Sequence, residues 1–210
     1  MCGITGIYNL NAAPVFRQDL QRMSDSIAHR GPDGEGLHIQ NHVGLAHRRL
    51  AILDLTPKGS QPMMSKDGRW IIVFNGCIYN YLELKQDLRS KGHEFNSTSD
   101  TEVLVEGLAE YGPGFFERLN GMFAVGAYNT QEDALFLSRD RYGVKPLYYW
   151  FTGEELVFAS EVKAIIAHPK YKKGINLGAL NEYFTFQNMF TFQTLLKDVW
   201  MLPPANTVRI

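Results

Sequence analysis

The sequence lacks the features that mark several classes of protein. It has only two cysteines, Cys2 and Cys77, and so no disulfide framework of the kind that staples small secreted domains. Its 21 basic and 22 acidic residues give a net charge of -1, so no basic excess points to nucleic acid or an anionic membrane. No apolar run approaches the ~20 residues of a membrane span, and the start lacks the basic and apolar regions of a signal peptide. We therefore expect a cytoplasmic protein that binds neither nucleic acid nor membrane.

The composition that remains is typical of a globular protein. Hydrophobic residues make up 45% of 210 residues, enough for a substantial core. Hydrophobic periodicity predicts helices at 16–29, 79–90, from 99 onward, 161–168 and 177–187, and strands at 37–39, 43–47, 70–74, 122–128, 134–139, 147–151, 156–159 and in the tail 199–210. Strands in two runs, with helices grouped between and after them, favour an α+β sandwich over βαβ alternation.

The second residue offers a nucleophile with its own base. If Met1 is removed, Cys2 carries an α-amine and a thiol on one residue, and the small residues after Met1 favour that removal. The amine has a reference pKa of about 7.7–8.0, so near neutral pH it can accept the thiol proton directly or through one water. The structural alternative is that Cys2 is a small buried hydrophobe in a strand.

Three further polar features stand where predicted elements begin or end. Arg49, between two apolar segments, is either a surface ion pair or a bidentate fork for a carboxylate. Asn75 and Gly76, at the end of an apolar strand, form either a turn or an oxyanion hole made of a side-chain amide and a backbone N–H. Asp100, in the first turn of a helix, either stabilises that helix or pairs with a ligand ammonium. Together with Cys2, these groups suit an α-amino acid that carries a side-chain amide, which is glutamine or asparagine.

Longer motifs in a fixed order extend this pattern along the whole chain. They occupy residues 1–4, 29–33, 46–54, 75–76, 78–80, 99–102, 121–124, 139–149 and 158–164. On these residues the chain resembles class II (N-terminal nucleophile) glutamine amidotransferase domains over 1–210. Within that family, the Arg-Leu-Ala-Ile form of residues 49–52 makes it most similar to the glutaminase domain of glutamine-hydrolysing asparagine synthetases.

The resemblance implies a fold, an activity and a role for each site residue. The expected fold is a four-layer αββα sandwich of two antiparallel sheets, the N-terminal nucleophile hydrolase fold. The expected activity is hydrolysis of the L-glutamine side-chain amide through a thioester, without a metal or cofactor; ATP and Mg are expected only in an attached synthetase domain. The implied roles are Cys2 as nucleophile, Asn75 and Gly76 as oxyanion hole, Arg49 as carboxylate clamp, Asp100 as ammonium partner, and Leu50, Ala51, Ile52, Leu53 and Cys77 as backbone lining of the site. Residues 29–33 are expected to frame the pocket, and the motifs around Arg139-Asp140 and Ser160-Glu161 to be buried structural polar groups.

Two departures from the family pattern keep alternatives open. Cys77 stands where the family usually has glutamate, which removes one anion from beside the substrate ammonium. No synthetase domain with a glycine-rich pyrophosphate loop follows within residues 1–210, so the ammonia acceptor is expected on the same polypeptide or a separate one. A glutamine-sensing or scaffolding domain without turnover is one alternative, and another acyl-amide hydrolase of the superfamily is a second. The oligomeric state stays open, a homodimer included.

Overall fold

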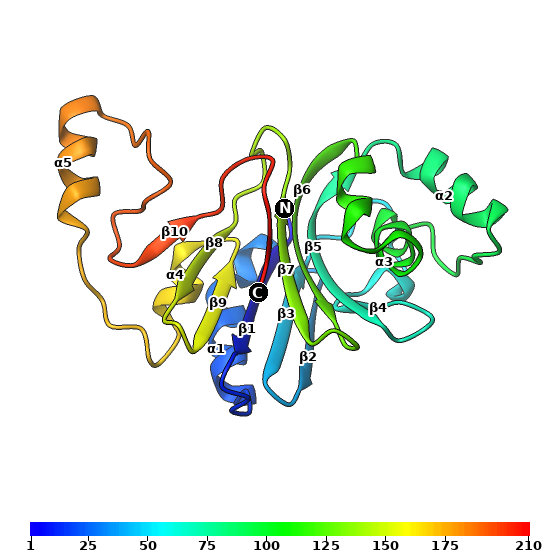
Figure 1. Ribbon diagram of the computed structural model, residues 1–210, viewed down its shortest axis with the longest axis horizontal. Helices are drawn as coiled ribbons and strands as arrows, with labels where there is room; N and C mark the ends of the chain where they lie inside the picture. Colours follow the sequence, from blue (N-terminus) through cyan, green and yellow to red (C-terminus); the bar gives the residue numbers. More distant parts are fainter.

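The computed structural model describes residues 1–210 and contains two antiparallel sheets packed face to face (Figure 1). The first sheet has the strand order β10-β8-β9-β1-β3-β2, with β1 Gly3–Asn9, β2 Gly34–Gln40, β3 Val43–Arg49, β8 Tyr148–Phe151, β9 Glu155–Ala159 and β10 Val199–Met201. The second has the order β11-β7-β6-β5-β4, with β4 Met63–Met64, β5 Trp70–Ile78, β6 Gly121–Asn129, β7 Ala134–Arg139 and β11 Thr207–Arg209.

Helices cover the outer face of each sheet. The α-helices are α1 Arg17–Ser26, α2 Tyr81–Ser90, α3 Asp100–Tyr111, α4 Val162–Ile166 and α5 Leu177–Phe186, and the short 3-10 helices are η1 Ala28–Arg30, η2 Pro57–Gly59 and η3 Gly112–Arg118. In Figure 1, α1 and α4 lie on the side of the first sheet, α2 and α3 on the side of the second, and α5 stands away from both sheets. No helix has the length and apolar composition needed to cross a membrane.

Three apolar clusters account for the layers. One joins the first sheet to α1 and α4, one fills the space between the sheets, and one joins the second sheet to α2 and α3. Strand β5 shows how alternation builds them, because Ile72 and Phe74 pack toward the helices while Ile71 and Val73 pack between the sheets. The predicted αββα sandwich is therefore confirmed, and residues 70–75 of β5 are buried on both faces.

Several element boundaries differ from the sequence prediction. The strand expected to end at residue 74 continues to Ile78, so Asn75 and Gly76 lie inside β5 and form no turn. The pairing of β5 with β6 over its whole length explains this, because a partner strand distant in sequence supplies the ladder hydrogen bonds. The helix predicted at 16–29 ends at Ser26 and is followed by η1, and the one predicted at 161–168 spans only 162–166. The tail adds a strand to each sheet, since β10 pairs with β8 and β11 pairs with β7.

The start of α3 is capped by the side chain of Ser99. The Ser99 hydroxyl accepts a hydrogen bond from the Thr101 N–H at 3.0 Å, as an N-cap serine commonly does. The Glu102 carboxylate does not bond back to Ser99; it accepts from the N–H groups of Asn96 (2.8 Å) and Ser97 (2.7 Å) instead. The loop before α3 is thereby fixed to the helix that carries Asp100.

Candidate active site

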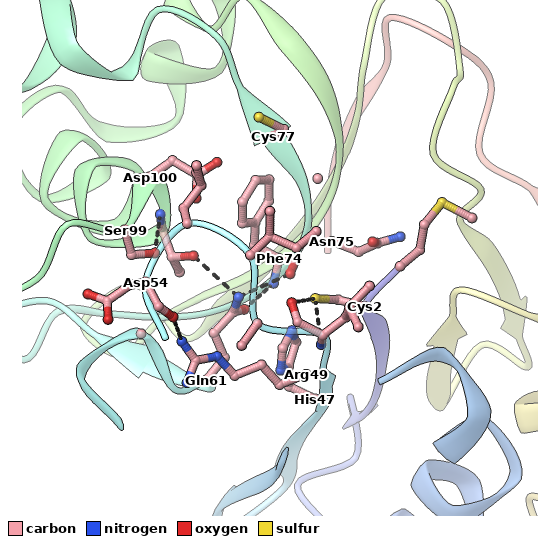
Figure 2. A pocket seen from close by; sticks show the side chains of 18 of the residues that line it. Cys2, His47, Arg49, Asp54, Gln61, Phe74, Asn75, Cys77, Ser99 and Asp100 are labelled. Carbon is pink, nitrogen blue, oxygen red and sulfur yellow. Dashed lines mark hydrogen bonds between the residues drawn. The ribbon is translucent and has the colours of Figure 1, made fainter. Parts of the chain in front are cut away.

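All the predicted site residues line one cavity of about 200 Å³ at one end of the two sheets. These residues are Cys2, Arg49, Leu50, Ala51, Ile52, Leu53, Asn75, Gly76, Cys77 and Asp100. Figure 2 shows Cys2 and Asp100 on opposite sides of this pocket, with Phe74 and Asn75 between them. The fold thus gathers groups that lie up to about a hundred positions apart in the sequence, although their individual roles stay predictions.

Cys2 lies directly before β1 and is half-buried. Its Sγ atom accepts a hydrogen bond from the Leu50 N–H at 3.4 Å and lies 3.6 Å from the Leu50 carbonyl oxygen, to which the thiol can donate. The Cys2 nitrogen is acylated by Met1 in this chain, so it is an amide rather than a basic amine. The thiol lies at the cavity wall, and a free α-amine on Cys2 forms only when Met1 is removed.

Arg30 holds the backbone of Cys2 from behind, a role that the sequence did not reveal. Its Nε donates to the Cys2 carbonyl oxygen at 2.9 Å, and its Nη1 donates to the Glu161 carboxylate at 2.9 Å. Burial raises the pKa of Glu161, but hydrogen bonds from Arg30, Lys163 and His29 outweigh it and lower that pKa to about 2. The carboxylate therefore stays ionised and keeps Arg30 in place. Glu161 is half-buried rather than buried as expected, but its contacts are structural, as expected.

Residues 29–33 do not line the cavity, but two of them hydrogen-bond residues that do. Besides Arg30, the Asp33 carboxylate accepts a hydrogen bond from the Ala51 N–H at 2.9 Å and so supports the loop of residues 50–53. Ser160 fixes β1 from the other side, because its hydroxyl accepts from the Ile4 N–H at 3.0 Å and its own N–H donates to the Ile4 carbonyl. The expectation that these residues frame the pocket holds only in this indirect sense.

Asn75 and Gly76 present hydrogen-bond donors from the interior of β5. Asn75 is 1% exposed, and its Nδ2 has no hydrogen-bond partner within the protein. A Cβ at Gly76 would lie 2.2 Å from the Met122 carbonyl oxygen on β6, which explains why only glycine fits there. The close approach of the two strands brings the Gly76 backbone against the cavity.

The hydrogen-bonding pattern of β5 leaves the Gly76 N–H facing the site. In an antiparallel ladder alternate residues direct their N–H groups to the same edge, so Phe74, Gly76 and Ile78 share one edge. There the Phe74 N–H donates to Gln61 Oε1 at 2.6 Å and the Ile78 N–H donates to Asp100 Oδ2 at 3.0 Å. The Gly76 N–H lies between these two occupied positions and is the donor left for a ligand.

Gln61 is a second residue that the sequence did not single out. Its side-chain amide accepts from the Phe74 N–H and donates to the Phe74 carbonyl oxygen at 3.1 Å, continuing the ladder beyond the two-residue strand β4. It also donates to the Thr101 hydroxyl at 3.3 Å, which links β5 to α3. No sequence signal pointed to this role, because the short strand β4 that Gln61 precedes was not predicted.

Asp100 is 95% buried at the start of α3, where burial raises the pKa of its carboxyl above the ordinary value. The hydrogen bond from the Ile78 N–H partly offsets this effect. Because Asp100 bonds the residue two positions beyond Gly76 on the same edge, the spacing between an anionic group and the Gly76 donor is fixed. A carboxylate held beside two hydrogen-bond donors suits a substrate with an ammonium at one end and an amide at the other.

Arg49, the last residue of β3, lies among carbonyl groups on the opposite wall. Its Nη1 donates to the Thr56 carbonyl at 2.8 Å, and its Nη2 donates to the Asp54 carbonyl (Figure 2). The Asp54 carboxylate stabilises this loop by accepting from the N–H groups of Thr56 (2.8 Å) and Thr98 (3.0 Å), and hydrogen bonds from both residues hold its pKa far below the usual range. The loop therefore orients a guanidinium at the cavity wall.

His47 lies two residues before Arg49 and also lines the cavity. It is 1% exposed, and burial lowers the pKa of its imidazole to about 3. It is therefore uncharged at neutral pH. The other ionisable side chains at the cavity wall include two basic residues, Arg49 and Lys145, and two acidic residues, Asp54 and Asp100.

Comparisons with known proteins agree with this geometry. The family model described as a glutamine amidotransferase domain matches residues 1–210. The chain belongs to the glutamine amidotransferase domain family. It is 41% identical over 205 residues to asparagine synthetase [glutamine-hydrolyzing] 2 of Bacillus subtilis, covering 96% of this chain and 25% of the relative. It is 40% identical over 222 residues to putative asparagine synthetase [glutamine-hydrolyzing] 2 of Methanocaldococcus jannaschii, covering 96% of this chain and 42% of the relative.

A solved structure supports the fold of this glutamine amidotransferase domain. Glutamine phosphoribosylpyrophosphate amidotransferase of B. subtilis, complexed with ADP and GMP, matches with a TM-score of 0.68 and 22% identity, over 83% of this chain and 45% of that chain. The domain is thus homologous to the amidotransferase part of glutamine-hydrolysing asparagine synthetases, as the motifs indicated. It spans a quarter to two fifths of these two synthetase relatives, and no acceptor domain lies within residues 1–210.

Proposed function

We propose that this domain hydrolyses the side-chain amide of L-glutamine to glutamate and ammonia. The single observation that carries the proposal is the Cys2 thiol facing a cavity whose other walls supply the Asn75 amide, the Gly76 N–H and the Asp100 carboxylate. A nucleophile opposite paired donors is the arrangement that acyl transfer requires. The same cavity is lined by Arg49 and Asp100, whose opposite charges suit the α-carboxylate and the α-ammonium of an amino acid.

The reaction follows from these groups in two stages. After removal of Met1, the Cys2 amine accepts the thiol proton, and sulfur attacks the amide carbon of glutamine. The developing oxyanion accepts hydrogen bonds from Asn75 and Gly76, the C–N bond breaks, and the proton held by the amine leaves with the ammonia. Water then attacks the thioester, gives its proton to the amine, and glutamate is released as the thiol is restored. No metal or cofactor takes part in this scheme.

Arg49 and Asp100 select the substrate in this proposal. Arg49 binds the α-carboxylate and Asp100 the α-ammonium, and the backbone of residues 50–53 lines the space between. An acyl-amide hydrolase with no amino-acid substrate would have no use for the two opposite charges. This separates the proposal from the second alternative raised by the sequence.

We propose further that the ammonia passes to an asparagine-synthetase-like acceptor domain, in cis or in trans, where ATP and Mg would be used. The names of the relatives and their greater length support this. So does an exposed apolar surface on and after α5, which stands away from the sheets in Figure 1. It consists of Leu177, Tyr183, Phe184, Phe186, Phe190 and Phe192. Exposed apolar patches of this kind mark protein contacts.

One experiment tests the glutaminase proposal against the sensor alternative. Ammonia and glutamate release from glutamine is measured on purified protein whose N-terminus has been defined by intact mass. Turnover that requires the Met1-free form and disappears in Cys2→Ala supports the enzyme. Glutamine binding by calorimetry with no turnover in the Met1-free form would favour a sensing domain, and full activity with Met1 retained would exclude the Cys2 amine as base.

A further inference from the structure

The motif at residues 139–145 has a detailed internal structure that the proposed chemistry leaves unused. The Asp140 carboxylate is fully buried and accepts hydrogen bonds from the N–H groups of Tyr142 (3.1 Å), Val144 (2.9 Å) and Lys145 (3.0 Å). Asp140 thus closes the loop between β7 and β8 into a fixed turn. Such a network of buried charge-assisted hydrogen bonds holds the backbone of Lys145 in one place.

Arg139 fixes the same loop from its other side. Its guanidinium donates to the carbonyl oxygens of Gly143 (2.6 Å), Lys145 (2.7 Å) and Leu202 (2.6 Å). The expectation that Arg139 and Asp140 are buried structural groups is confirmed. Their shared effect is to hold the backbone N–H and C=O of Lys145 at the wall of the active-site cavity.

The Lys145 side chain is buried there without an anionic partner. Lys145 is 6% exposed, and its Nζ lies 3.2 Å from the Met1 Sδ, which is its only hydrogen-bond contact. A thioether is a weak acceptor, and none of the salt bridges includes this ammonium. Buried lysines without a partner are unusual, because burial disfavours the charge. Removal of Met1 would take away this contact, while Lys145 lines the same cavity as Cys2.

The other charged and titratable groups around the cavity come from every wall. They are Arg30 with Glu161 behind Cys2, His47 and Arg49 on β3, Asp54 in the following loop, Cys77 on β5, Asp100 on α3, and Arg139, Asp140 and Tyr148 beside the Lys145 loop. Of the cations, Arg30 is paired with Glu161, while Arg49 and Arg139 are occupied by carbonyl oxygens. His47 is uncharged. Among these cations, Lys145 is the one whose side chain has neither an anionic partner nor a carbonyl acceptor.

We propose that Lys145 is a positioning residue for the nucleophile: once Met1 has been removed, its ammonium favours loss of protons from the Cys2 amine and thiol. A fixed positive charge in a partly buried site stabilises a neutral amine over an ammonium and a thiolate over a thiol. The N-terminal cysteine would then reach its reactive, deprotonated form at a lower pH than an isolated one. The consequence for turnover rests on the proposed function, but the effect on Cys2 itself does not.

Two variants and a control test this on Met1-free protein. Lys145→Met keeps the length and apolar stem of the side chain and removes the charge, while Lys145→Arg retains the charge. Lys172→Met removes an exposed lysine that does not line this cavity. For each protein, alkylation of Cys2 by iodoacetamide is followed from about pH 5 to about pH 9 by peptide mass spectrometry, which distinguishes Cys2 from Cys77. The pH profile of kcat/KM for glutamine and the Tm are measured on the same proteins.

We expect both profiles of Lys145→Met to move to higher pH by roughly one unit, with KM little changed and activity recovering at high pH. Lys145→Arg and Lys172→Met should keep the parent profiles. The proposal would be overturned if the pH profiles of folded Lys145→Met did not move, or if Lys145→Arg shifted them equally. A rise in KM alone in Lys145→Met would also overturn it, because Lys145 would then be a substrate contact. If the parent protein shows no turnover, the alkylation profiles still test the role of Lys145. Failure of the Lys145 proposal can therefore be distinguished from failure of the proposed glutaminase function.

Discussion

Removal of the Asn75 side chain should separate catalysis from stability. Asn75 is 1% exposed, but its Nδ2 has no partner in the protein, so Asn75→Ala breaks no hydrogen bond of that donor. We expect the free energy of unfolding to fall by about 1 kcal/mol, the typical cost of a point substitution. For a domain of this size that corresponds to a Tm decrease of about 2–4 °C.

The effect on turnover should be much larger. Loss of one oxyanion-hole donor costs about 2.7–4 kcal/mol of transition-state stabilisation in a comparable enzyme, which corresponds to a kcat lower by about 10²–10³. The Gly76 N–H remains, because its orientation is set by β5 and by the neighbouring bonds to Gln61 and Asp100, so some activity should persist. KM should change little, since the oxyanion exists only in the transition state.

Steady-state ammonia release and thermal unfolding on the same preparation check both parts of this prediction. Asn75→Asp is the matched variant, because it keeps the shape of the side chain and replaces the donor by a charged acceptor. It should lose at least as much kcat as Asn75→Ala. A variant with normal kcat and a raised KM would show that Asn75 binds the substrate in its ground state. A Tm loss beyond about 10 °C would show that the fold depends on Asn75, and the reasoning from the unpartnered amide would fail.

Four other changes test the remaining groups. Cys2→Ala should abolish ammonia release while calorimetry still detects glutamine binding, and loss of both would mean that the thiol is needed to form the pocket. Arg49→Ala should raise KM roughly tenfold to a hundredfold with a smaller effect on kcat, because a charge-assisted hydrogen bond contributes about 1.5–3 kcal/mol in both states. Since burial raises the pKa of Asp100, glutamine affinity should begin to fall at a higher pH than for an ordinary aspartate as acid protonates this carboxylate, and a pH-independent affinity would contradict this. Cys77→Glu, in reducing buffer, should lower KM by supplying a second anion for the substrate ammonium, and an unchanged KM would remove that argument.

The elements that carry their own local signals could be predicted from the sequence. The apolar run of residues 70–74 identified a strand, and the pattern from residue 99 onward identified the start of α3. Asp100 could then be placed in the first turn, where the structure has it. In each case the signal and the element lie within a few residues of each other, so the local pattern was sufficient.

The groups that were missed depend on partners far along the chain. Asn-Gly is a common turn sequence, and only the pairing of β5 with β6 shows that residues 75 and 76 continue a strand. Arg30 reaches Cys2 across 28 positions and Glu161 across 131. No periodicity or spacing in one sequence encodes such contacts, because they exist only when two sheets and their helices have packed together.

Asp140, a buried residue with no proposed chemical role, fixes the hydrogen-bonding pattern of the strands beside the site. Asp140 accepts from the Phe123 N–H at 3.1 Å and its own N–H donates to the Phe123 carbonyl at 2.9 Å, so both polar groups of Phe123 point away from β5. Phe123 is the residue opposite Gly76, and this arrangement makes them a pair without mutual hydrogen bonds. The Gly76 N–H therefore has to point toward the cavity. A motif whose sequence suggested only structural burial thus determines the direction of the Gly76 N–H, the proposed oxyanion donor, and the same aspartate fixes the loop that carries Lys145.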